Sequence, residues 1–235
     1  MRSLPIHATL VDQAYEAILS DVSAGKFGPD SRLIQEELAE SLGVSRQPIQ
    51  QALLLLRRQG ILRDAPGRGL MLAPLDPEYV RNVYEIRAMI DGLASDKAAE
   101  RGRETAAQEG PAHIKRGRAA VASRSISKMI AADMGFHFFL YRLSGNPLVA
   151  EASAMHWSFL RRVMGEVLLR GETPDDIWNQ HEGILAAVSA GESRTAERLA
   201  REHISHASHT LISELQSRPR AEPSAATSKR ARGRH

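Results

Sequence analysis

The chain has 235 residues, of which 43% are hydrophobic, and its formal net charge is +3. This length allows two modest domains or one large one with a real hydrophobic core. The absence of cysteine excludes disulfides, thiolate metal sites and cysteine nucleophiles, so nitrogen and oxygen must hold any metal. No run of about 18 uncharged apolar residues occurs, and an acid interrupts the N-terminal segment too early for a signal peptide. We therefore expect a cytoplasmic protein with no membrane partner.

The apolar residues recur mostly with helical periodicity, which predicts a mostly α fold with one small β element. Thr9 and Ser45 are suited to begin helices as N-caps, and glycines follow the expected helix ends. A two-stranded ribbon with a turn at Pro66-Gly67 is predicted after the third helix. The three N-terminal helices are predicted over residues 10–24, 34–42 and 46–59.

From Glu78 onward the pattern predicts a bundle of helices separated by glycine and proline breaks. One of these breaks is expected at Gly110-Pro111. The segment from about residue 217 onward is basic, rich in Pro, Ser and Ala, and lacks periodicity, so it is predicted to be disordered. The predicted bundle helices cover residues 78–101, 111–122, 126–144, 148–170, 175–190 and 192–215.

A helix, a short helix, a glycine turn, a capped helix and a β ribbon form the layout of a winged helix-turn-helix. Residues 41–70 carry five arginines against one aspartate, a net +4 that fits either a nucleic-acid-reading face or a solvated helix. In this layout the first turn of the capped helix faces bases, where Arg pairs best with guanine and Gln with adenine. The predicted DNA-binding residues are Ser45, Arg46, Gln47 and Gln50 on that helix, and Arg68 and Gly69 at the ribbon tip.

A carboxylate and an imidazole stand four residues apart at Asp133 and His137, so a helix points both in one direction. His181 and His203 lie on two later predicted helices that could converge on the same point. One carboxylate and three imidazoles suit Zn²⁺, Ni²⁺, Mn²⁺ or Fe²⁺. The spacing alone also fits a polar helix face with hydrogen-bonded core histidines. A different helix register would replace His203 by His206 or His209.

The segment LIQEELAESLGVSRQPIQQALLLLRRQGILRDAPGRG resembles the DNA-binding domain of the GntR family of bacterial transcription factors. The resemblance implies a winged helix that binds DNA, with a protein-binding helix-turn-helix as the alternative. Gln50 and Gln51 stand where the family usually has Arg and Glu, so the operator sequence is left open. The matching positions are Leu38, Ala39, Leu42, Gly43, Val44, Ser45, Arg46, Pro48, Ala52, Leu53, Leu56, Gly60 and Gly69.

The later part of the chain resembles the all-helical FCD (FadR C-terminal domain) subfamily, and more its six-helix vanillate-type members. The family patterns D-x-x-F-H, E/Q-H-x-x-I-L and R-x-H-I/L match around Asp133, His137, His181 and His203. The resemblance implies that these four residues hold a divalent metal, with Zn²⁺ the main expectation. The segment around Arg87 resembles a pattern whose Arg faces the effector cavity. Arg87 is therefore predicted to bind the effector, with a salt bridge to Asp91 or Glu85 as the alternative.

These patterns predict a homodimeric repressor of a catabolic operon that leaves a two-fold operator when a small carboxylate binds at the metal. The expected domains are a winged helix-turn-helix at residues 9–75, an FCD domain at 78–216 and a basic tail at 217–235. We expect no enzymatic activity. The alternatives are a metal-dependent enzyme, with Glu182 or Glu202 as base, and a sensor of the metal itself.

Overall fold

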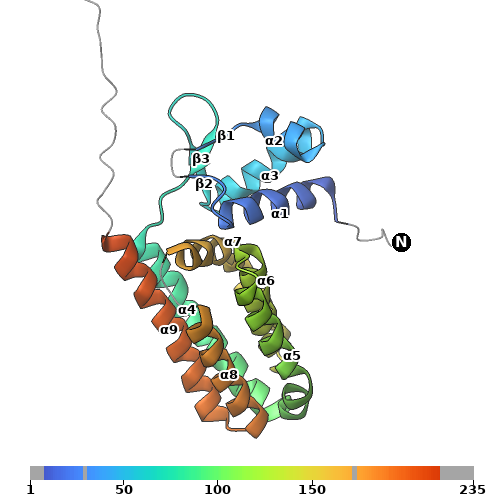
Figure 1. Ribbon diagram of the computed structural model, residues 1–235, viewed down its shortest axis with the longest axis vertical. Helices are drawn as coiled ribbons and strands as arrows, with labels where there is room; N and C mark the ends of the chain where they lie inside the picture. Colours follow the sequence, from blue (N-terminus) through green and yellow to red (C-terminus); the bar gives the residue numbers. More distant parts are fainter. Residues whose placement is uncertain (1–7, 29–30, 171–173, 218–235) are drawn as a thin grey trace, which may run out of the picture.

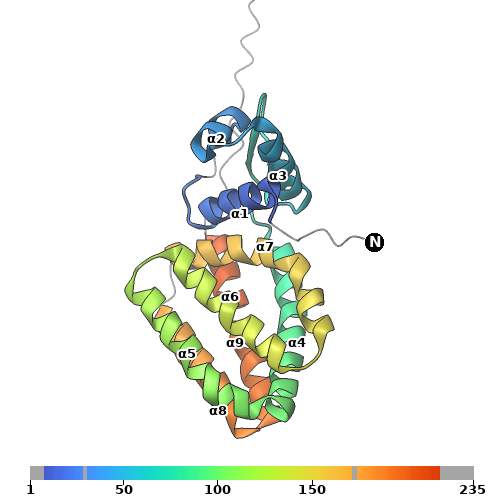
Figure 2. The same ribbon diagram turned by 90° about the vertical axis from the view of Figure 1, so that its right-hand side faces the viewer.

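A computed structural model describes residues 8–28, 31–170 and 174–217. It is mostly helical, with a small sheet, as the sequence predicts. A winged helix-turn-helix lies at one end of the molecule, against one end of a longer helical bundle (Figures 1 and 2). Most of the predicted disordered tail, residues 218–235, lies outside the described residues.

The N-terminal part is built from α1 (Leu10–Ser23), α2 (Gln35–Leu42) and α3 (Arg46–Arg58) around one small core. Thr9 caps α1 as predicted: its hydroxyl accepts a hydrogen bond from the Asp12 amide at 3.1 Å, and the Asp12 carboxylate accepts one from the Thr9 amide at 2.9 Å. Gly43 ends α2 in the left-handed conformation, with a φ of 66°. Ile18, Ile49 and Leu56 fill the space between α1 and α3.

The β element has three strands, β1 (Arg32–Leu33), β2 (Leu62–Asp64) and β3 (Leu70–Leu72), with the antiparallel order β1-β3-β2. The predicted two-stranded ribbon therefore corresponds to β2 and β3, while β1 was missed. A strand of two residues is too short to give an alternating pattern, so its pairing with β3 is decided by tertiary contact.

The bundle comprises α4 (Pro77–Arg101), α5 (Arg103–Ala122), α6 (Ile126–Leu143), α7 (Pro147–Arg170), α8 (Pro174–Ala190) and α9 (Ser193–Ser217). The long helices α4 and α9 lie side by side along the molecule, and α5 and α6 lie opposite them (Figures 1 and 2). Two apolar clusters fill the bundle. In the part of the chain that is described, no helix is long and apolar enough to cross a membrane.

The predicted break at Gly110-Pro111 is wrong, because α5 runs through it and the chain breaks at Gly102 instead. Gly110 packs directly against Leu185 of α8, where a Cβ would overlap the leucine side chain. Gly102 similarly lies against Leu143. The glycine that the sequence suggested as a helix end is therefore a close helix-helix contact, and α5 continues through Pro111.

Candidate metal centre and DNA-binding surface

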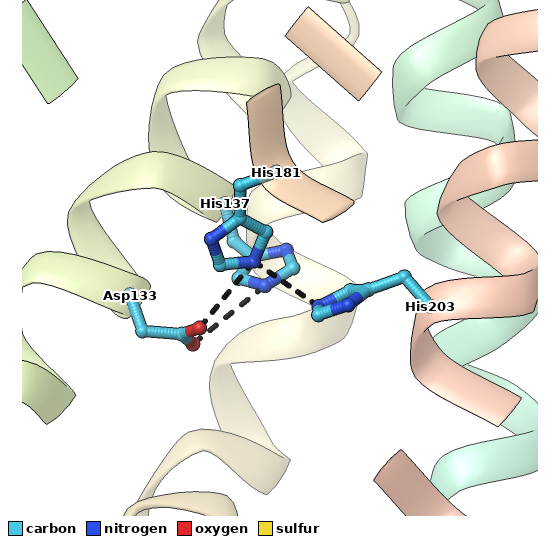
Figure 3. A group of neighbouring side chains, drawn as sticks. All are labelled: Asp133, His137, His181 and His203. Carbon is cyan, nitrogen blue, oxygen red and sulfur yellow. Dashed lines mark hydrogen bonds and ion pairs between the residues drawn. The ribbon is translucent and has the colours of Figure 1, made fainter. Parts of the chain in front are cut away.

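Asp133, His137, His181 and His203 meet inside the bundle, contributed by α6, α8 and α9 (Figure 3). All four side chains are buried, and one ligand atom from each lies within 4.8 Å of the others. His181 Nε2 lies 3.1 Å from His203 Nε2 and 3.5 Å from Asp133 Oδ1, and His137 Nε2 lies 3.6 Å from Asp133 Oδ2. Ligand atoms around a tetrahedral Zn²⁺ with bonds of about 2.0 Å are separated by about 3.3 Å. The spacing therefore fits a single divalent ion.

Two further side chains fix the orientation of the imidazoles. Asp91 Oδ1 lies 2.6 Å from His137 Nδ1, and Gln180 Oε1 lies 2.7 Å from His203 Nδ1. Because each oxygen can only accept, each Nδ1 carries the proton and donates it, which leaves the Nε2 lone pair for the metal. His137 Nε2 is buried and has no hydrogen-bond partner among the described residues. This atom is suited to be a ligand.

Burial determines the charge of His181 and His203. It lowers the pKa of His181 and His203 well below the usual value, and repulsion from neighbouring histidines and Arg87 adds to the effect. Both imidazoles are therefore neutral at physiological pH, which is the form that binds metals. Burial opposes the charge of Asp91, but His137 and Arg87 outweigh it and lower the pKa of this carboxyl.

Arg87 lies next to the centre and is only 6% exposed. Its Nε is 3.5 Å from Asp91 Oδ2, so the anticipated salt bridge to Asp91 is present, and its Nη2 is 3.9 Å from Asp133 Oδ2. Nε and Nη2 nevertheless make no hydrogen bond within the described residues. Burial disfavours its charge, but Asp91, Tyr141 and Asp133 raise the pKa of Arg87 above its usual value. The cation is therefore permanent and retains donor capacity.

A cavity of about 50 Å³ adjoins these groups. Arg87, Asp133 and His203 line it together with apolar side chains of α7 and α8, including Met164 and Trp178. His206 is exposed at the same cavity, as expected for its rim, and His209 is exposed on α9. The site thus combines two neutral imidazoles, an adjacent cation and a small space, an arrangement that suits a metal with an anionic ligand.

The predicted DNA-binding residues lie on one exposed surface. Ser45, Arg46, Gln47 and Gln50 are exposed at the beginning of α3, although the Ser45 side chain makes no capping hydrogen bond. Arg68 and Gly69 are exposed on the β2–β3 loop. A groove of about 720 Å³ brings Gln50, Arg68 and Gly69 together between the helices and the wing.

Two residues that sequence reasoning missed organise this surface. Glu36 of α2 lies 3.5 Å from Arg46 Nη1 and 3.3 Å from Arg68 Nη2, so one carboxylate links α3 to the β2–β3 loop, which is the wing. Arg32 of β1 donates to the Pro66 and Arg68 carbonyl oxygens at 2.9 and 3.2 Å, which holds the wing loop. Neither spacing is local in sequence, and the same holds for Asp91 and His137.

The fold and the surface define a DNA-binding transcription regulator. The bacterial regulatory proteins of the gntR family match residues 10–72, and the FCD domain family matches residues 82–206, more than half of the chain. The chain belongs to the GntR family, with an FCD domain as its second part.

Individual relatives agree with this membership. The chain is 22% identical over 199 residues to the HTH-type transcriptional repressor RspR of Escherichia coli, covering 85% of this chain and 87% of that protein. It is 30% identical over 89 residues to an uncharacterized HTH-type transcriptional regulator of Agrobacterium vitis, and this match spans only 52% of that protein. Its fold resembles E. coli McbR/YncC with a TM-score of 0.74, at 21% identity over 88% of this chain and 99% of that chain. The names of the two relatives from E. coli and A. vitis describe transcriptional regulators.

Proposed function

We propose that this regulator is a homodimeric repressor whose DNA binding is released by a small carboxylate at a Zn²⁺-type metal centre. Residues 9–75 would read a two-fold operator, and residues 78–216 would hold the metal and the effector. The observation that carries the proposal is the buried convergence of Asp133 with three imidazoles beside Arg87. The repressor role extends to this chain what the name of the E. coli relative states.

The donor set favours a borderline divalent ion. Asp133 would supply an oxygen and His137, His181 and His203 would supply Nε2 atoms, with the histidine orientations set by Asp91 and Gln180. Such an ion supplies a Lewis-acidic positive charge and can accept additional oxygen ligands. Without an ion, the buried His137 Nε2 makes no hydrogen bond within the described residues, and leaving a buried polar atom without a partner is unfavourable.

A carboxylate is the effector class that this environment favours. Its oxygens would complete the metal's coordination on the cavity side, where Asp133 and His203 are accessible. The unsatisfied Nε and Nη2 donors of Arg87 would receive the remaining oxygens. The small volume of the cavity disfavours a bulky thioester and favours a compact acid.

An apolar stripe on α4 supports the homodimer. Ile86, Met89 and Leu93 recur at helical spacing and are 50%, 57% and 45% exposed. An isologous contact between two such stripes would relate the two winged helices by a two-fold axis. That symmetry matches a two-fold operator. Light scattering of the full chain, compared with Met89→Glu, tests this directly: the dimer should be lost in the variant.

The two glutamates that the enzyme alternative would use as a base do not lie at the centre. Glu182 is paired with Arg118 at 2.7 Å and Glu202 with Arg198 at 2.8 Å, and these glutamates are 60% and 59% exposed on the bundle surface. Neither is placed to activate a water on the buried ion. The metal-sensor alternative makes a distinct prediction, namely that metal alone changes DNA affinity.

Elemental analysis of purified variants tests the ligand set. His181→Ala and His203→Ala should lose the metal, whereas the exposed His209→Ala on the same helix as His203 should retain it as a matched control. In thermal melts, acids should stabilise metal-loaded wild-type protein more than their uncharged amides do. Full occupancy in both ligand variants would mean that the site is wrong. Equal stabilisation by acids and amides would mean that the effector class is wrong.

A further inference from the structure

Helix α7 lies between the winged helix-turn-helix and the metal cavity. Both views place it directly beneath α1, across the top of the bundle (Figures 1 and 2). Trp157, Leu160 and Val163 anchor its inner side in the bundle core. Its outer side forms a polar junction with the DNA-binding part.

Arg162 is the central contact of this junction and is 5% exposed. Its Nη1 donates to the Ile61 carbonyl oxygen at 3.1 Å, and its Nη2 donates to the Ala73 carbonyl oxygen. These carbonyls flank the β2–β3 hairpin, and the Ala73 amide itself donates to the Ile61 oxygen at 3.0 Å. Burial lowers the pKa of Arg162 to about 10, with Glu166 partly offsetting this, so the group stays cationic at neutral pH. A buried cation is therefore hydrogen-bonded to the two carbonyl groups at the base of the β2–β3 hairpin.

The rest of the junction is closely fitted. Gly165 faces the end of α1, where any Cβ would overlap the backbone of Ser23. The Tyr15 hydroxyl hydrogen-bonds Ser158, and Arg161 pairs with Glu16 at 2.6 Å. Hydrogen bonds and backbone contacts of this kind tolerate little displacement.

The same turns of α7 also reach the metal cavity. Met164 and Leu168 line it together with Arg87 and Asp133, and the Trp157 ring lies 4.9 Å from the Arg87 guanidinium carbon. The cavity of about 50 Å³ has room for about three to five waters at about 10–15 Å³ each. A dicarboxylate of eight non-hydrogen atoms is larger than this space, so its binding would press on the side chains that line the cavity, Met164 and Leu168 among them.

We propose that α7 transmits occupancy of the cavity to the DNA-binding part, with Arg162 as the positioning residue that docks the wing while the cavity is empty. This inference rests on the proposed metal and carboxylate site. Because α7 is one continuous helix, a ligand that pushes on Met164 and Leu168 also moves Arg162 and Gly165. The docked arrangement is then loosened, and the two winged helices of a dimer are no longer held at a fixed spacing.

Amide hydrogen exchange of the full chain tests the linkage, with Zn²⁺ plus succinate as the probe and metal-free protein as reference. In wild-type protein, the probe should slow exchange in α8 and α9, which reports binding. It should speed exchange of residues 61–73 about fivefold or more, the lower end of typical allosteric coupling. Arg162→Met should keep the slowing in α8 and α9 but show fast exchange at 61–73 with or without the probe.

Two further variants control the result. Arg142→Gln removes an exposed pair with Glu109 elsewhere on the bundle and should respond like the wild type. Tyr15→Phe removes only the hydroxyl at the junction, so it provides a second test if Arg162→Met folds poorly. In this variant the probe should change exchange at residues 61–73 less than in the wild type. Slowing in α8 and α9 without a change at 61–73 in the wild type would overturn this inference alone. Absence of that slowing would overturn the proposed site and this inference together.

Discussion

Asp91 is the most informative single residue of the proposed metal centre, because two buried hydrogen-bond donors and one buried cation contact it. It accepts from His137 Nδ1 at 2.6 Å and from the Tyr141 hydroxyl at 3.1 Å, and it lies 3.5 Å from Arg87 Nε. Asp91→Asn keeps the shape of the side chain but removes its charge and leaves one acceptor oxygen for these donors. Among the described residues, Arg87 would then keep Asp133, at 3.9 Å, as its one ion-pair partner.

The expected magnitudes follow from these contacts. Losing a carboxylate that orients a metal-binding imidazole typically weakens metal affinity by about 10- to 100-fold. Removing one partner of a buried ion pair costs about 3 to 5 kcal/mol, and the oxygen that Asn retains places this case near the lower end. For a chain of this length, about 3 kcal/mol lowers the melting temperature by about 6 to 12 °C.

Zinc affinity should be measured by competition with a chromophoric chelator, alongside melts of the metal-free proteins. Asp96→Asn is the matched control, because Asp96 lies on the same helix and pairs with Lys97 at 3.0 Å near the surface. Its effect on stability should be about 1 kcal/mol or less. If Asp91→Asn binds zinc as tightly as the control does, the orientation of His137 by Asp91 does not matter and the reasoning fails.

Three other predictions concern the DNA surface and pH. Arg46→Ala should weaken binding to a selected operator by about 1 to 3 kcal/mol per half-site, and it should weaken binding to random DNA less. If a fluorescence titration shows equal weakening on both DNAs, Arg46 reads no base. Glu36→Gln removes the carboxylate that pairs with Arg46 and Arg68, so both operator and random DNA should bind more tightly, by up to about fivefold. Unchanged affinity for both DNAs would show that Glu36 does not hold these arginines away from DNA. The lowered pKa of His181 and His203 means that the unfolded chain binds more protons below about pH 6.5. The free energy of unfolding of metal-free protein should therefore fall with decreasing pH, by up to about 2.7 kcal/mol per pH unit for the pair, and about half as steeply in His203→Ala. Equal slopes in urea denaturation would refute the burial of two neutral imidazoles.

The local features of this protein could be predicted from its sequence. The Thr9 cap, the glycine turn before α3 and the period of the bundle helices follow from interactions within a few residues, so pattern reasoning found them. Asp133 and His137 share a face for the same local reason. That His181 and His203 join them from two other helices is tertiary information, and it came from the resemblance rather than from spacing.

The features that were missed are long-range. β1 is defined by its pairing with the distant β3, and Gly110, where α5 continues instead of ending, packs against Leu185 of α8. The hydrogen bond of His137 to Asp91 joins two helices, and the hydrogen bond of Arg162 to Ile61 joins the bundle to the DNA-binding part. Periodicity and short motifs describe local sequence, so they cannot predict which charged side chain hydrogen-bonds to which carbonyl group of a distant segment.

The central claim is that a carboxylate acts on DNA binding through the metal centre, and one titration tests it directly. The Kd for a selected operator should be measured on zinc-loaded protein with and without the acid that stabilises it most. We predict that the acid raises the Kd by about fivefold or more, and that chelation or Arg87→Gln abolishes the effect. An equal rise on metal-free protein, or with the uncharged amide of the same acid, would contradict the account.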